Sequence, residues 1–355
     1  MLKGKGCIQG PSLVTHVSLP SVHSSTDIVR TNISKLKYIS RKPCGIAARA
    51  ATNSVFITDN FEPALAKSLR DHFEERFSTP LVTSSDRFIW DYWHVPNQYA
   101  LMRTQAENFF PQDLQAQLED AVIAFGEKTL GCRGISPIWI SYYVDGHFQN
   151  FHTDSPHGPF AFVLSLSPET FRGGETMVLR ENILDFWRNF DSTAVEMGQI
   201  MDLYEPLFSR LCIFDARLPH GVRQVEGVKD PLEARVVLHG WFTEPTAFFE
   251  GNIDEDGATT VLNSVLVNLY EELGQMAMAC GIIVFRCTIN PDGCVASLEI
   301  LTNTLRIRPQ SLQNPDEALD DILGCIQHHL TTLDFSENVI PDQGNSQITL
   351  PFIFD

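Results

Sequence analysis

The chain has 355 residues, enough for two domains and an extension, and 43% of them are hydrophobic, as in an ordinary globular protein. The formal net charge of −18 argues against nucleic acid or an anionic membrane as a partner held by bulk charge. The sequence contains no apolar run of the roughly 18 residues that indicates a membrane-spanning helix.

The charge is distributed unevenly along the chain. Residues 1–53 hold eight of the 26 basic side chains but one of the 44 acidic ones, so that 18 basic and 43 acidic side chains remain elsewhere, a net charge of −25. The segment is also rich in serine and threonine and lacks the continuous apolar stretch of a secretory signal. This composition predicts an organelle transit peptide, with the chloroplast favoured over the mitochondrion. The alternative is a disordered basic tail that is not cleaved, on a cytoplasmic protein.

Two amphipathic helices are expected at the start of the next region. The first covers about residues 62–77, with Pro63 in its first turn and apolar side chains four residues apart. The second spans about 112–130 and ends at Gly131. Between them lies an aromatic stretch, 88–94, which fits either the wall of a substrate pocket or a strand that covers the core.

A β-rich block follows, in which short apolar strands alternate with turns rich in glycine and proline. Strands are expected at 138–144, 160–166, 175–179, 211–214 and 235–242. The pattern predicts an α+β fold with a double-stranded β-helix, or jelly-roll, core and helices packed on one side. The stretch 180–210 is longer than a compact barrel needs, and it fits a substrate-covering loop or a surface insertion equally well.

A candidate metal site lies within this block. His152 and Asp154 form an H-x-D motif, and residues two apart on an extended strand point to the same side. Two imidazoles and one carboxylate can bind one face of an octahedral Fe(II) ion and leave the other face open. The third ligand must come from another strand, and His220 is the candidate. H-x-D alone is weakly specific, because a chain with 11 histidines is expected to contain about one by chance.

The motifs around H-x-D make the pattern specific by their order. They are Tyr143-x-x-Gly146, Gly173-Gly174-Glu175-Thr176, Phe214-Asp215, Pro219-His220-Gly221-Val222, and Arg235 six residues before Trp241-Phe242. This ordered set resembles the prolyl-4-hydroxylase-like branch of the Fe(II)/2-oxoglutarate dioxygenases over roughly residues 54–246. The resemblance implies an oxidoreductase that uses Fe(II), 2-oxoglutarate and O₂, with ascorbate as reductant.

The resemblance also implies roles for single residues. His152, Asp154 and His220 match the iron ligands of the family. Arg235 matches the basic residue that pairs with the distal carboxylate of 2-oxoglutarate, and its fork suits that task. Tyr143 matches a tyrosine that often touches the same cosubstrate. No catalytic residue is expected beyond these metal ligands.

One spacing departs from the family pattern. His220 and Arg235 are fifteen residues apart, as if 228–232 were a small insertion, and Arg223 and Lys229 are therefore the alternative anchors. His147 and His157 flank the triad, and each fits either a contact with substrate or, as favoured, a surface or supporting position. His239, in the last strand, is expected to be structural. The eight cysteines form neither a C-x-x-C pair nor a zinc-site spacing, which predicts reduced thiols, most of them in apolar surroundings.

The family resemblance implies hydroxylation of a peptidyl residue, with proline as the family default. A dioxygenase that acts on a small molecule is the first alternative, and a catalytically silent binding or assembly protein is the second. A peptide substrate predicts an open groove beside the metal, whereas a small molecule predicts a closed cavity. The intact ligand set counts against the silent alternative.

The C-terminal part has a different pattern. Residues 247–279 are expected to form a linker and a helix, and 280–355 a small β-β-α-β domain with the turn Asn290-Pro291-Asp292-Gly293. The latter segment resembles, less closely, the TonB-C-terminal/AgmX-PglI type of domain, which implies a protein partner and no catalysis. His328 and His329 are adjacent on a helix, so their rings diverge and no metal is expected on the pair.

Overall fold

The computed structural model describes residues 16–17, 54–78, 89–180, 199–308, 314–340 and 343–354. Most of the expected transit peptide and most of the expected 180–210 loop lie outside the described residues, so both stay predictions. The chain divides into two compact units, one of Asn53–Pro245 and one of Met1–Thr52 with Thr246–Asp355. None of the described helices is long and apolar enough to span a membrane.

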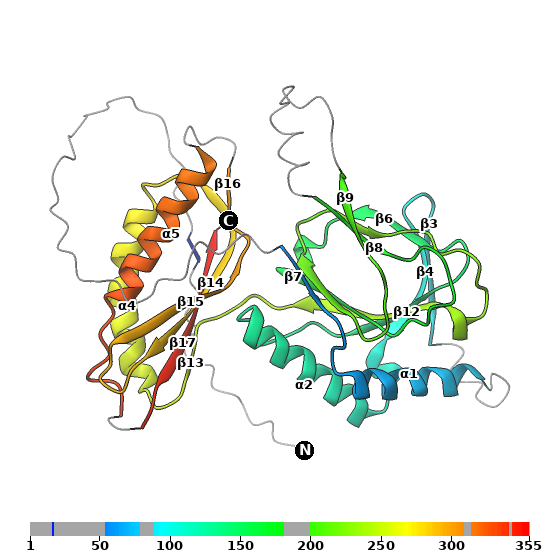
Figure 1. Ribbon diagram of the computed structural model, residues 1–355, viewed down its shortest axis with the longest axis horizontal. Coiled ribbons are helices and arrows are strands. Elements are labelled where there is room, and N and C mark those ends of the chain that lie inside the picture. Colours follow the sequence, from blue (N-terminus) through cyan, green and yellow to red (C-terminus); the bar gives the residue numbers. More distant parts are fainter. Residues whose placement is uncertain are drawn as a thin grey trace, which may run out of the picture. The chain divides into compact units, whose positions relative to one another are not determined.

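The first unit is a double-stranded β-helix built from antiparallel strands (Figure 1). One row has the order β10 (Leu211–Asp215), β7 (Phe160–Ser165), β12 (Arg235–Phe242) and β5 (Trp139–Tyr143). The other has the order β6 (Phe148–His152), β11 (His220–Val222), β8 (Thr176–Leu179) and β9 (Met201–Tyr204). Strand β4 (Tyr99–Gln105) pairs with both β5 and β6, so the two rows form one curled sheet. The expected jelly-roll core is confirmed.

Two further strands extend this sheet. Strand β2 (Val55–Thr58) pairs with β10, and β3 (Asp91–Val95) pairs with β4. The five strands expected from the apolar runs are all present, and each end differs from the expected one by at most one residue. Strands β6 and β11 have no such apolar run.

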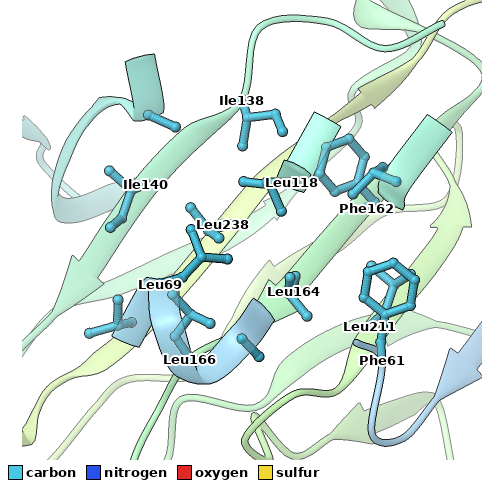
Figure 2. Packing of buried hydrophobic residues seen from close by; sticks show 14 of the residues in the cluster. Phe61, Leu69, Leu118, Ile138, Ile140, Phe162, Leu164, Leu166, Leu211 and Leu238 are labelled. Carbon is cyan, nitrogen blue, oxygen red and sulfur yellow. The ribbon is translucent and has the colours of Figure 1, made fainter. Parts of the chain in front are cut away.

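Helices α1 (Pro63–Ser78) and α2 (Gln112–Thr129) cover the β10-β7-β12-β5 row and bury a shared core. Figure 2 shows Leu69 of α1 and Leu118 of α2 among Ile140, Leu164 and Leu238 of the sheet. Each of these five side chains is at most 1% exposed. Burial of one leucine or isoleucine stabilises the fold by about 1.5–3 kcal/mol, so this layer holds the sheet against the helices.

The second unit has its own sheet and core. Strands β15 (Val295–Asn303), β14 (Ala279–Ile289) and β17 (Ser346–Phe354) are neighbours, and three short strands pair at the margins: β1 (His16–Val17), β13 (Phe248–Glu250) and β16 (Arg306–Ile307). Helices α4 (Glu255–Leu273) and α5 (Pro315–Thr331) share one apolar core with this sheet. The expected β-β-α-β order is present, and α4, expected between the domains, packs within this unit. The likeness to a TonB-C-terminal domain stays a prediction.

A substitution at Gly126 of α2 tests the close contact between this helix and the sheet. A Cβ atom at this position would meet the buried ring of Phe242 and lie 3.0 Å from the carbonyl oxygen of Cys132. Gly126→Ala should gain about 1 kcal/mol of helix propensity but lose about 1–3 kcal/mol through overpacking, and so lower the free energy of unfolding. Thermal unfolding followed by circular dichroism measures the change.

Gly324 of α5 is the matched control, because a Cβ there meets nothing within 4 Å. Gly324→Ala should raise the stability of its unit by about 0.5–1 kcal/mol. If Gly126→Ala stabilised the protein as much as Gly324→Ala, the close approach of α2 to β12 would be wrong.

Candidate active site

The structure brings the three predicted metal ligands together. His152 is the last residue of β6 and His220 the first of β11, and the two are direct partners in the antiparallel register. Their ring centroids lie 4.4 Å apart, and Asp154 follows His152 by two residues. One ligand atom from each of the three residues lies within 4.8 Å of the other two. Asp154 and His220, 66 positions apart in sequence, are thus brought together by the pairing of β6 with β11.

Backbone carbonyl groups set the orientation of both imidazoles. Nδ1 of His152 lies 2.9 Å from the carbonyl oxygen of Asn150, and Nδ1 of His220 lies 2.9 Å from that of Leu218. A carbonyl oxygen can accept a hydrogen bond but cannot donate one, so each Nδ1 carries the proton and each Nε2 keeps its lone pair for a metal. The Nε2 atoms lie 3.6 and 3.2 Å from the two Asp154 oxygens. This donor set fits an Fe(II) ion.

The charge state of Asp154 suits a ligand role. Burial alone would raise the pKa of this carboxyl, but the hydrogen bond and charge that His220 offers when protonated, the charge of protonated His152 and the Trp241 hydrogen bond outweigh it and lower the pKa to about 2. Nε1 of Trp241 donates to Oδ2 of Asp154 at 3.0 Å. Burial, helped by the charge of His220, lowers the pKa of His152, which favours the neutral imidazole. A carboxylate and neutral imidazoles are the forms that bind metal.

Arg235 begins β12 opposite Tyr143 and is 1% exposed. Its Nε donates to the carbonyl oxygen of Gly174 at 2.6 Å, and its Nη2 donates to Oγ1 of Thr176 at 3.3 Å. Its Nη1 is buried without a hydrogen-bond partner among the described residues. A buried guanidinium with an unpaired donor is costly, so the arrangement favours an anion in the space beside it.

The Gly173-Gly174 motif makes room for this arginine. Gly174 has φ +77, and a Cβ there would lie 2.9 Å from Cδ of Arg235. Any larger residue would therefore push the guanidinium away from its bonds to Gly174 and Thr176. The alternative anchors are placed differently, since the Arg223 side chain is 58% exposed and bonded to Glu175, and Lys229 is exposed.

The ligand trio, Arg235 and Tyr143 line one cavity of about 280 Å³. The Tyr143 ring centroid lies 4.7 Å from the Arg235 guanidinium carbon. Burial raises the pKa of the Tyr143 hydroxyl, while the positive charges of Arg235 and Arg103 act in the opposite direction. The Tyr143 hydroxyl donates to Oε1 of Gln149 at 3.5 Å, a long hydrogen bond that an anion beside Arg235 can replace.

Several cavity residues were missed from the sequence. The guanidinium of Arg103, on β4, lies over the rings of Trp93 and Trp139, at 3.2 and 4.2 Å from their centroids. The one sequence feature that indicates this position is the alternation along β4. Tyr99, Leu101 and Arg103 occupy every second position, and all three line the cavity. The sequence motif includes Trp241, but nothing in the sequence indicates that its Nε1 donates to Asp154.

The aromatic stretch divides between the cavity and the core, and His239 lies beside the cavity. Of the aromatic stretch 88–94, Trp93 lines the cavity, whereas Trp90 packs on Phe77 and Tyr142 in the core. His239 is partly buried, and its Nε2 lies 2.8 Å from Oγ of Ser141. Burial, with a smaller effect of the Arg103 charge, lowers the pKa of His239 to about 3, so this ring is neutral.

Comparison with known proteins supports the class of this domain. Residues 138–243 match the family model of the 2OG-Fe(II) oxygenase superfamily. This match spans the ligand trio, Arg235 and Tyr143, and it confirms the resemblance to 2-oxoglutarate-dependent oxygenases. The domain is thus that of an oxidoreductase of this class, for which Fe(II), 2-oxoglutarate and O₂ are implied. The comparison with curated proteins found no match.

Solved structures give weaker likenesses. The chain is similar to a Pseudomonas putida prolyl-4-hydroxylase at 16% identity and a TM-score of 0.39, over 54% of this chain and 94% of that one. A prolyl hydroxylase from Trichoplax adhaerens, in complex with a hypoxia inducible factor peptide fragment, has 14% identity and a TM-score of 0.39 over 54% and 84% of the two chains. HygX from Streptomyces hygroscopicus, with nickel and 2-oxoglutarate bound, has 10% identity and a TM-score of 0.36 over 53% and 82%. These values leave the substrate open.

Trp241 tests the support of the metal ligands. Trp241→Phe keeps an aromatic ring next to His157, 4.6 Å away between centroids, but removes the donor to Asp154. Loss of such a partner should weaken Fe(II) binding about tenfold or more. Anaerobic Fe(II) titration of the purified full chain measures it. Trp90→Phe, in the core and away from the cavity, is the control and should bind as the wild type does. Equal affinities in all three proteins would contradict the role of this hydrogen bond.

Proposed function

We propose that the protein is an Fe(II)- and 2-oxoglutarate-dependent dioxygenase that hydroxylates a peptidyl residue, with proline as the first candidate. The observation that carries the proposal is the shared cavity, in which the convergent atoms of His152, Asp154 and His220 face the same space as the unpaired donor of Arg235. A metal-binding trio and a buried anion anchor in one space match the needs of a metal ion and a dicarboxylate cosubstrate.

The chain's own residues supply positioning and charge. Asp154 stays ionised, held by Trp241, and the two carbonyl-bound imidazoles aim Nε2 at the metal. Fe(II) held there would supply the redox chemistry that inserts one atom of O₂ into the substrate and one into succinate, with ascorbate keeping the metal reduced. Arg235, fixed by Gly174 and Thr176, would hold the distal carboxylate of 2-oxoglutarate through Nη1. Fixing the cosubstrate in one orientation lowers the entropic cost of reaching the reactive geometry.

The cavity lining supports a prolyl side chain as the target. Trp93, His157 and Trp241 line the cavity beside the ligand trio, and Trp93 is 38% exposed. Aromatic faces suit an apolar pyrrolidine ring, and the partial exposure of Trp93 is compatible with a residue that stays part of a peptide chain. Chloroplast targeting and a protein partner of the C-terminal unit stay predictions from the sequence.

The first test is turnover. The purified full chain, supplied with Fe(II), ascorbate, 2-oxoglutarate and a library of proline-containing peptides, should release succinate and add one oxygen atom to a prolyl residue, as seen by mass spectrometry. His152→Ala should bring both signals to background, because one imidazole fewer leaves the metal poorly held. Oxygen transfer to a small molecule and to none of the peptides would replace the peptidyl proposal. Absence of both Fe(II) binding and succinate in the wild type would overturn the enzyme proposal itself.

The second test separates the anchor from the alternatives. Lysine at position 235 keeps the charge but cannot bond Gly174, Thr176 and an anion at once. Arg235→Lys should therefore raise the KM for 2-oxoglutarate by about tenfold or more, since a charged hydrogen bond contributes about 1.5–3 kcal/mol, with a smaller change in kcat. Arg223→Lys, at an exposed position, is the matched control and should leave KM unchanged. The reverse ranking of the two variants would move the anchor to Arg223.

A further inference from the structure

A second cluster of metal-binding side chains lies in the C-terminal unit, between α4 and α5. Glu272 belongs to the last turn of α4, and Cys325 and His329 lie on α5. Cys325 and His329 are four residues apart, so both side chains point from the same face of α5. The two helices run side by side in Figure 1 and share an apolar core. The helix packing therefore brings a carboxylate to a cysteine–histidine pair.

The distances within the cluster fit a tetrahedral ion. Nε2 of His329 lies 3.2 Å from Oε1 of Glu272, and Sγ of Cys325 lies 3.5 Å from Oε2. One ligand atom from each residue lies within 4.8 Å of the other two. Around Zn²⁺, with bonds of about 2.3 Å to sulfur and 2.0–2.1 Å to nitrogen or oxygen, tetrahedral neighbours lie about 3.3–3.6 Å apart. The two contacts are of this size, one to each oxygen of the Glu272 carboxylate.

Burial separates this cluster from an ordinary surface ion pair. Cys325 is 9% exposed, and the His329 side chain is 13% exposed. Nε2 of His329 is buried and lacks a hydrogen-bond partner of good geometry among the described residues, although it faces the Glu272 carboxylate. Glu272, 57% exposed, closes the cluster on the solvent side. A buried imidazole nitrogen without a proper partner is what a metal ion would satisfy.

Space for a fourth ligand lies next to the three. A pocket is lined by Glu272 and Cys325 and also by Asp321 and His328. Asp321 precedes Cys325 by four residues and so lies one turn earlier on α5. A water molecule or the Asp321 carboxylate can therefore complete four-fold coordination.

We propose that Cys325, His329 and Glu272 form a Zn²⁺ site that links α4 to α5. One thiolate, one imidazole and one carboxylate suit this ion of intermediate softness. When zinc binds, the Cys325 thiol releases its proton to solvent and the S–Zn bond replaces the S–H bond, with no change of redox state. The bound ion would stabilise the C-terminal unit, because the unfolded chain holds these three side chains far apart.

Cobalt(II) is the probe, because a thiolate bound to Co²⁺ gives a near-ultraviolet charge-transfer band that histidine and carboxylate ligands do not give. Titration of the metal-free full chain with Co²⁺ should produce this band, and added Zn²⁺ should abolish it. The His152–Asp154–His220 trio contains no cysteine, so Co²⁺ bound there does not contribute. The readout is thus independent of the proposed oxygenase activity.

Variants assign the band to its residues. Cys325→Ser should remove it, and His329→Gln and Glu272→Gln should each weaken Co²⁺ binding at this site at least tenfold. Cys294→Ser is the matched control, since Cys294 is an exposed thiol of the same unit outside the cluster. Far-ultraviolet circular dichroism checks that each variant is folded. No thiolate band in the wild type, or a band that survives Cys325→Ser, would overturn the proposal.

Discussion

The antiparallel register between β6 and β11 is the constraint on which the first unit depends. It sets His220 directly opposite His152. Strand β11 pairs with β8 on its other side, so the position of His220 is fixed from two directions. A shift of one residue would turn every side chain of β11 to the opposite face of the sheet. The candidate metal-binding trio therefore converges only in the native register, and the pairing of β11 within the curled sheet fixes that register.

Strand β12 connects this register to the core. Its side chains alternate, with Val236, Leu238 and Phe242 in the core shared with the helices and Arg235, His239 and Trp241 facing the cavity. The helices thus hold β12 through one face while its other face carries the anchor and the partner of Asp154. Because the two faces belong to one rigid strand, packing against α1 and α2 also fixes the distance between Arg235 and the metal ligands. Loss of helix packing should therefore change the position of Arg235 relative to the ligand trio.

The sequence predicts those parts that local pattern determines. The apolar strands and both pairs of amphipathic helices follow from periodicity, and the trio follows from H-x-D together with motif order. Strands β6 and β11 are not predicted from the sequence, because β6 is largely polar or exposed and β11 is only three residues long. The position of Arg103 in the cavity is not predicted either, for a different reason. Its place over Trp93 and Trp139 depends on the pairing of β4 with both β3 and β5, which no local pattern reveals.

The cluster between α4 and α5 shows the same limit in helical form. Cys325 and His329 have the four-residue spacing of a metal-binding pair, but the sequence draws attention to the adjacent histidines instead. The completing ligand, Glu272, lies 53 residues earlier and is brought near by the packing of two helices. Apolar side chains decide that packing, and the polar trio is placed as a result. In both units the polar constellation is thus specified by hydrophobic contacts that do not touch it.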